Sequence, residues 1–125
     1  MKLEVGQFAR LKSGYICKII NINDFREPNM KYGVEANYLK DVMFIGDDDV
    51  VKASYNIIDI LEVGDYANGY IVEEIKRGYD GKIWIDNSTR GYDEGGEYTI
   101  WKRNEDIKSV ITHEQMEQMA YKVGE

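Results

Sequence analysis

The sequence has 125 residues, of which 43% are hydrophobic and 31% charged, and this composition suits one compact domain or two very small ones. It carries 16 Lys and Arg against 23 Asp and Glu, a net charge of −7, which argues against a general binder of nucleic acid or anionic membranes, because phosphate contacts need clustered basic side chains. A single cysteine and a single histidine exclude an internal disulfide and disfavour zinc sites and most histidine chemistry.

The beginning of the chain lacks the apolar run of a secretory signal, and the longest apolar stretches have only the length of a strand. Together with the unpaired thiol of Cys17, these features predict a cytoplasmic protein. Cys17 falls in a predicted strand, and no basic partner that would lower its pKa is evident, so we expect a packed small hydrophobe and not a nucleophile.

An internal repeat organises the sequence. The segment Glu4–Ala9 (EVGQFA) returns as Glu62–Ala67 (EVGDYA), and the Val-Gly step appears a third time at Val123–Gly124, where Glu125 follows it. A recurrence roughly every 60 residues indicates a tandem duplication, with a first unit over 1–61 and a second over 62–125.

Five strands are expected in the first unit, because apolar and polar residues alternate between glycine turns: Phe8–Lys12, Ile16–Asn23, Lys31–Asn37, Asp41–Phe44 and Ile57–Leu61. Asp47–Asp49 precede Val50–Ser54, which predicts a helical turn with acidic residues at its N-terminal end. Lys52 stands where a calcium-binding EF-hand loop requires glycine, so we favour capping over cation binding.

The second unit repeats this inventory, with expected strands at Tyr66–Ala67, Ile71–Lys76, Lys82–Asp86, Tyr98–Lys102, Asp106–Val110 and Tyr121–Val123. Thr112 and Gln115 fit a capping box, which predicts a short helix over 112–120. His113 would lie in its first turn, and without a second His or a Cys nearby no metal site is expected. About five short strands per unit predict a mainly β fold of two tandem small SH3-like barrels with short helical inserts.

Two similar segments provide the first candidate contact residues. Arg77–Gly81 (RGYDG) nearly returns as Arg90–Gly96 (RGYDEGG), and neither segment matches a phosphate-binding glycine motif. Both are typical of turns, and both would also present an Arg, a Tyr and an Asp on an exposed loop at opposite ends of the strands. The candidate binding residues from these segments are Arg77, Tyr79, Asp80, Arg90, Tyr92 and Asp93.

Trp84 and Trp101 are the remaining candidates. They alternate with isoleucines at 83, 85 and 100, so core packing is one interpretation and an aromatic partner surface is the other. The same rings could stack on a nucleobase if scattered arginines converged in the fold to hold a phosphate.

Nothing in the sequence favours catalysis. No carboxylate pair has a recognisable acid–base spacing, and no serine has the context of a hydrolase nucleophile. We therefore expect a non-enzymatic protein without catalytic residues, cofactor or metal, in which His113→Ala leaves any activity nearly unchanged.

A family resemblance rests on the run Ser54–Tyr70 and on the tail, Asn104–Gln115 and Tyr121–Glu125. These motifs resemble those of small proteins from phages, prophages and plasmids of Gram-positive anaerobes, with departures between Phe25 and Asp49. The resemblance covers most of the chain and implies a genetic setting, without supplying catalytic residues to transfer.

In that setting, we expect a protein that binds and inhibits a host antiphage defence component stoichiometrically, in the manner of an anti-CRISPR inhibitor whose acidic surface occupies a basic channel. The alternatives are a sponge for a nucleotide-derived immune signal and a phage accessory protein-interaction module. Direct nucleic-acid binding ranks last among the functions considered, and no membrane partner is expected. The sequence is compatible with a monomer or a homodimer. An exposed apolar patch would favour a protein partner, whereas a pocket with two or more Arg or Lys would favour a small ligand.

Overall fold

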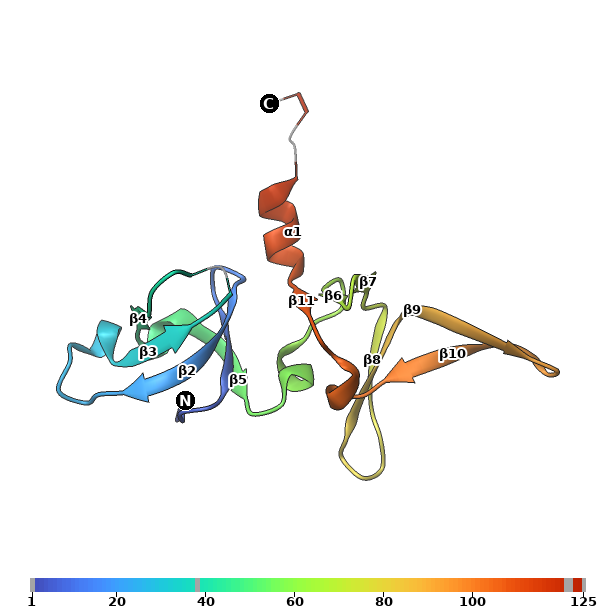
Figure 1. Cartoon of the computed structure of the whole chain (residues 1–125), viewed down its shortest axis with the longest axis horizontal. Helices are drawn as coiled ribbons and strands as arrows, with labels where there is room; N and C mark the ends of the chain where they lie inside the picture. The colour runs from blue at the N-terminus through green and yellow to red at the C-terminus, as the bar shows by residue number, and fades with distance from the viewer. Residues whose placement is uncertain (1, 38, 121–122, 125) are drawn as a thin grey trace. The chain divides into compact units, whose positions relative to one another are not determined.

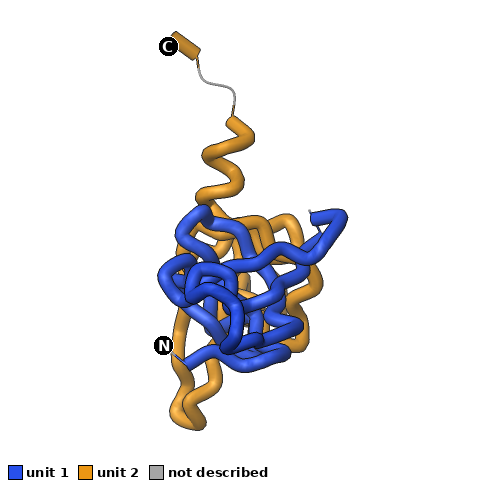
Figure 2. The backbone as a smooth tube through the Cα atoms, turned by 90° about the vertical axis from the view of Figure 1, so that its left-hand side faces the viewer, with its two compact units in different colours: residues 1–60 blue, residues 61–125 orange. Residues whose placement is uncertain are grey.

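The computed structural model describes residues 2–37, 39–120 and 123–124, and it is mainly β, as predicted (Figure 1). The chain divides into two compact units, residues 1–60 and 61–125 (Figure 2). Within the described part of the chain, no helix is long and apolar enough to cross a membrane.

The first unit is one antiparallel sheet with the strand order β4-β3-β2-β1-β5. Its strands are β1 (Phe8–Leu11), β2 (Ile16–Ile22), β3 (Tyr32–Glu35), β4 (Met43–Ile45) and β5 (Val50–Ser54). Alternate residues of these strands point into one core, whose buried members are Leu3, Ala9, Leu11, Cys17, Ile19, Tyr32, Val34, Ile45 and Val50. The 3-10 helices η1 (Pro28–Met30), η2 (Asp47–Asp49) and η3 (Ile57–Ile60) complete the unit.

The second unit contains two antiparallel sheets, with the strand orders β11-β6-β7 and β10-β9-β8. Its elements are β6 (Tyr66–Ala67), β7 (Tyr70–Ile71), β8 (Glu74–Arg77), β9 (Ile83–Asp93), β10 (Gly96–Lys102), η4 (Asn104–Asp106), β11 (Val110–Ile111) and α1 (His113–Met119). Ala67, Val72 and Ile85 are fully buried apolar residues of this unit. Asn87, also buried, donates from Nδ2 to the carbonyl of Ala67 over 3.1 Å and so ties β9 to β6.

The predicted closed barrels are not found among the described residues. In the first unit β4 and β5 are the two edges of the sheet and do not pair with each other. The strands of the second unit are divided between two separate three-stranded sheets. The architecture is therefore a set of open antiparallel sheets.

Two expectations in the first unit are wrong. Val50–Ser54 forms strand β5 and not a helical turn, because its β-branched valines pair well in the sheet and only the three preceding aspartates form a 3-10 turn. Ile57–Ile60 forms helix η3 and not a strand, because Ser54 and Asn56 close a turn before it and the turn directs Ile58 and Ile60 inward.

The second unit departs from prediction in the length of β9, which runs to Asp93 and not only to Asp86. Gly91 is tolerated in this strand because the ring of Tyr98 on β10 covers it: a Cβ on Gly91 would lie 2.5 Å from Tyr98 Cζ. The predicted strand Asp106–Val110 is instead η4 followed by the short β11. The strand predicted over Tyr121–Val123 falls largely on 121–122, outside the described residues.

The repeated Val-Gly steps form the same turn in both units. Gly6 has φ of 95° and Gly64 has φ of 98°, values in the left-handed region that favours glycine. Gly6 donates its backbone N–H to the carbonyl of Ile19 over 2.7 Å, and Gly64 donates to Val72 over 2.9 Å. The sequence repeat therefore corresponds to a repeated local structure.

Candidate functional site: an aromatic and cationic pocket

A pocket of about 640 Å³ lies on the β8-β9-β10 sheet of the second unit. Its size lies within the range of small-molecule sites. Two cations, two tryptophans and the residues of a tight turn line it: Lys76, Arg77, Gly78, Tyr79, Trp84 and Trp101.

The register of the sheet explains why these side chains meet. Lys76 on β8 pairs directly with Trp84 on β9, and Trp101 on β10 pairs with Asp86. Because side chains two residues apart share a face, Trp84 and Trp101 are diagonal neighbours on one face. Ile85, between Trp84 and Asp86, points to the other face and is fully buried. The tryptophans therefore lie opposite this core position and remain partly accessible to a ligand.

Each tryptophan ring has a cation beside it. The ammonium of Lys76 lies 5.7 Å from the centre of the Trp101 ring, and the guanidinium carbon of Arg103 lies 5.6 Å from that of Trp84. Contacts at this range are weak cation–π interactions, about 0.5–1 kcal/mol at exposed sites. Lys76 is therefore held only weakly over the Trp101 ring, whereas Arg103 also pairs through Nε with Glu105 Oε1 over 3.2 Å.

The turn from Gly78 to Lys82 forms one wall of the pocket. Arg77 donates from Nη1 to the carbonyl of Gly81 over 2.9 Å, and the Asp80 carboxylate accepts the backbone N–H of Lys82 over 3.0 Å. Asp80 thus shapes the turn, whereas Arg77 uses one of its five N–H donors there. Tyr79 is fully exposed at the tip of the turn.

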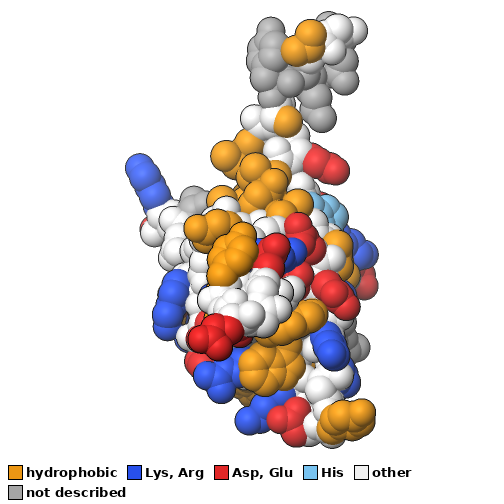
Figure 3. Space-filling model, turned by 90° about the vertical axis from the view of Figure 1, so that its right-hand side faces the viewer, with side chains coloured by type: hydrophobic (Ala, Val, Ile, Leu, Met, Phe, Trp, Pro, Cys, Tyr) orange, Lys and Arg blue, Asp and Glu red, His pale blue; other side chains and the backbone are white. Residues whose placement is uncertain are grey.

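The pocket combines flat apolar rings with positive charge, on a chain whose net charge is −7. Indole rings stack on other flat rings, while ammonium and guanidinium groups pair with phosphate or carboxylate. On the face shown in Figure 3, Lys and Arg side chains lie beside hydrophobic ones and close to acidic ones. The chemistry of the pocket suits a flat ring that carries negative charge.

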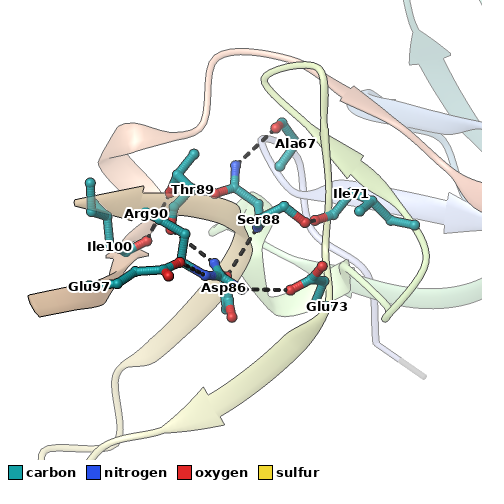
Figure 4. Close-up of polar contacts among 10 residues, drawn as sticks. Ala67, Ile71, Glu73, Asp86, Ser88, Thr89, Arg90, Glu97 and Ile100 are labelled. Carbon is teal, nitrogen blue, oxygen red and sulfur yellow. Dashed lines mark hydrogen bonds and ion pairs between the residues drawn. The ribbon is translucent and has the colours of Figure 1, made fainter. Parts of the chain in front are cut away.

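Arg90, one of the predicted contact residues, is surrounded by acidic partners (Figure 4). Its Nη1 lies 3.0 Å from Asp86 Oδ1, its Nη2 lies 3.1 Å from Glu73 Oε2, and its Nε lies 3.5 Å from Glu97 Oε1. Hydrogen bonds to Glu73 and Asp86 raise the pKa of Arg90 above its ordinary value. We therefore assign Arg90 a structural role at the bend of β9.

The backbone at that bend is unusual. Ser88 has φ of 67°, a conformation that costs a non-glycine residue about 1–3 kcal/mol, and its N–H donates to Asp86 Oδ1 over 3.0 Å. The bend therefore depends on the Asp86 carboxylate, which Arg90 also contacts (Figure 4).

Tyr92 and Asp93 lie at the far end of β9, near the β9–β10 turn. The side chain of Tyr92 is exposed, and Asp93 accepts the N–H of Gly95 over 2.7 Å within that turn. The two similar segments are thus at opposite ends of β9, as the sequence indicated. Of the eight predicted residues, the pocket brings together Arg77, Tyr79, Trp84 and Trp101.

Lys76 and Arg103 neighbour the tryptophan rings and are not among the residues predicted from the sequence. Lys76 could have been identified by predicting how β8 pairs with β9, because Lys76 lies directly opposite Trp84 in that pair. Glu62 was not predicted either: its carboxylate lies 3.0 Å from His113 Nε2, although the two residues are far apart in the sequence.

Comparisons with protein-family models, with curated proteins and with solved structures found no match to the chain.

Proposed function

We propose that this chain is a non-catalytic binding protein of a phage or other mobile element, and that its Trp84–Trp101 pocket captures a nucleotide-derived ligand. The observation that carries the proposal is the convergence of Lys76, Arg77 and both tryptophans in one pocket. In the setting implied by the family resemblance, such a protein would act as a sponge for a nucleotide-derived immune signal of the host.

Both the base and the phosphate of a nucleotide match groups in this pocket. Its base offers a π face to the indole rings, worth about 1–3 kcal/mol per stacked base. Its phosphate offers oxygens to Lys76 and Arg77, the two cations that line the pocket. A short nucleotide needs only these cations, whereas a long nucleic acid would meet a chain with a net charge of −7.

Inhibition of a host defence protein is the second candidate. The exposed rings of Tyr79 and Tyr92 favour it, since tyrosine is enriched at the centres of protein interfaces. An acidic chain could also occupy a basic nucleic-acid channel of its target, where charge complementarity speeds association. Arg90 is less suited to contact a partner, because its guanidinium already pairs with three carboxylates.

Affinity capture tests the proposal and distinguishes capture of a nucleotide from inhibition of a host protein. The tagged protein is recovered from lysate of phage-infected cells, and the eluate is divided between small-molecule and protein mass spectrometry. We expect a nucleotide to be released on heating from the wild-type protein and to be absent from Trp84→Ala and Trp101→Ala, because each variant removes a stacking surface.

Tyr92→Ala is the matched control, since it removes an exposed ring from the same strand outside the pocket. It should release as much nucleotide as the wild type. A stoichiometric host protein without any nucleotide, captured equally by the tryptophan variants, would reject the pocket and favour the inhibitor.

We also propose that the two units are open variants of one ancestral SH3-like unit. The shared turns at Gly6 and Gly64, with equivalent hydrogen bonds to the following strand, support a common origin. A further parallel is that Glu4 donates its N–H to the side chain of Gln7, as Glu62 does to that of Asp65.

A further inference from the structure

We infer that Glu62, His113 and Glu114 form a binding site for a divalent transition-metal ion, with Zn²⁺ as the best-matched ion. The inference is independent of the Trp84–Trp101 pocket, and none of the three residues lines that pocket. It rests on how three ligand atoms converge from two parts of the second unit that are distant in the sequence, Glu62 on one side and the adjacent His113 and Glu114 on the other.

The ligand atoms all lie within 4.8 Å of one another. His113 Nε2 is 3.0 Å from Glu62 Oε1 and 2.5 Å from Glu114 Oε1. One imidazole nitrogen carries at most one hydrogen, so it cannot form two full hydrogen bonds to the two carboxylates. Three ligand atoms gathered this closely, one nitrogen and two carboxylate oxygens, match what a metal ion requires.

The backbone around these ligands is fixed by one buried side chain. Asp65, which has 0% exposure, accepts the N–H of Glu62 at Oδ2 over 2.7 Å and the N–H of His113 at Oδ1 over 2.9 Å. A single carboxylate thus joins the turn that carries Glu62 to the segment that carries His113. The side chains of the ligands remain 28–36% exposed, so an ion can enter from solvent.

The donor set selects the class of ion. One imidazole nitrogen with two carboxylate oxygens suits Zn²⁺, which takes nitrogen and oxygen ligands at about 2.0–2.2 Å in a tetrahedral arrangement. Tetrahedral donors at that distance lie roughly 3.4 Å apart. Relative to His113 Nε2, from which they now lie 3.0 and 2.5 Å, the two carboxylate oxygens need to move outward by less than about 1 Å. Ca²⁺ and Mg²⁺, which prefer oxygen ligands alone, are less suited.

The equivalent turn of the first unit lacks this chemistry and supplies a matched control. There Glu4 occupies the position of Glu62, and its carboxylate accepts a hydrogen bond from the hydroxyl of Tyr55. A tyrosine in place of the histidine gives no imidazole ligand. Glu4→Gln therefore changes the corresponding glutamate without touching the site.

The test is isothermal titration of ZnCl₂ into the full-length protein, with any affinity tag removed because polyhistidine binds zinc. We expect one ion per chain, with binding weakened at least tenfold in Glu62→Gln and in His113→Ala and unchanged in Glu4→Gln. Zinc should also raise the melting temperature of the wild type and not that of His113→Ala.

Circular dichroism of each variant without zinc keeps the test informative, because a variant that retains the wild-type spectrum has lost ligands and not its fold. No saturable binding by the wild-type protein up to about 1 mM zinc would overturn the inference. Binding by a folded His113→Ala with wild-type affinity would overturn it equally, because the ion would then be held elsewhere.

Discussion

Cys17 is the single cysteine of the chain, and its thiol is packed in the core of the first unit. The side chain is 2% exposed, and its Sγ lies 3.8 Å from the carbonyl of Ala9. Burial disfavours the charged thiolate and raises the pKa of Cys17 from 9.0 to about 12. The residue is therefore a packed small hydrophobe, as its sequence context indicated.

The raised pKa of Cys17 gives a prediction for stability at alkaline pH. The thiol of the unfolded chain loses its proton near pH 9.0, whereas the folded thiol keeps it up to about pH 12. Proton release thus favours the unfolded state as the pH rises through this window. The excess stability of the wild type over Cys17→Ala should therefore shrink across pH 9.0, as measured by urea unfolding on either side of it. A constant difference would mean that the thiol titrates alike in both states.

At the scale of single residues, the pocket also shows how much the residue types alone could predict. The two tryptophans and the RGYDG turn were recognisable as candidates because aromatic and arginine residues are typical of binding surfaces. Arg90 has the same local sequence as Arg77, yet three carboxylates engage it. Only the pairing of β9 with its neighbours distinguishes the two arginines.

At the scale of elements, Asp65 connects two parts of the second unit. Its carboxylate accepts the backbone N–H groups of Glu62 and His113, next to the start of α1. The helix has seven residues, too short to be stable by itself in water. Besides its own cap at Thr112, it therefore relies on the anchoring by Asp65.

Asp65→Asn should lower the free energy of unfolding by about 1–3 kcal/mol, because asparagine has only one side-chain oxygen and leaves one of two partly buried N–H groups without its acceptor. Gln7→Ala is the comparison, since Gln7 makes the equivalent bond to Glu4 at an exposed position and should cost less than about 1 kcal/mol. Chemical denaturation of both variants measures the difference. Equal small losses would show that the buried carboxylate does not anchor the helix.

The errors in predicting elements share one physical cause. Short segments such as Val50–Ser54 and Ile57–Ile60 hold apolar residues that fit either a strand or a turn, and their pairing partners decide the outcome. β9 continues past its predicted end because Tyr98 on the neighbouring strand covers Gly91. In contrast, the turns at Gly6 and Gly64 were predictable, since their signal is local.

At the scale of the whole molecule, the charge of the chain and the charge of its pocket have opposite signs. A net charge of −7 disfavours polyanions in general, while Lys76 and Arg77 provide positive charge at one place beside the indole rings. This contrast predicts binding of small aromatic anions and weak binding of long nucleic acids. The weak binding of long nucleic acids follows from the composition, whereas the binding of small aromatic anions follows only from the folded sheet.

The chain contains two tryptophans, and both line the pocket, so its intrinsic tryptophan fluorescence reports directly on the central claim. The most direct measurement is a titration of that fluorescence with nucleoside monophosphates and cyclic dinucleotides, using the wild type, Lys76→Ala and the control Tyr92→Ala. We predict saturable quenching for at least one of these nucleotides, weakened about tenfold or more in Lys76→Ala and unchanged in Tyr92→Ala, because the lost cation would pair with the phosphate. Emission that no nucleotide changes, or quenching that Lys76→Ala leaves intact, would contradict the proposal that the pocket captures a nucleotide.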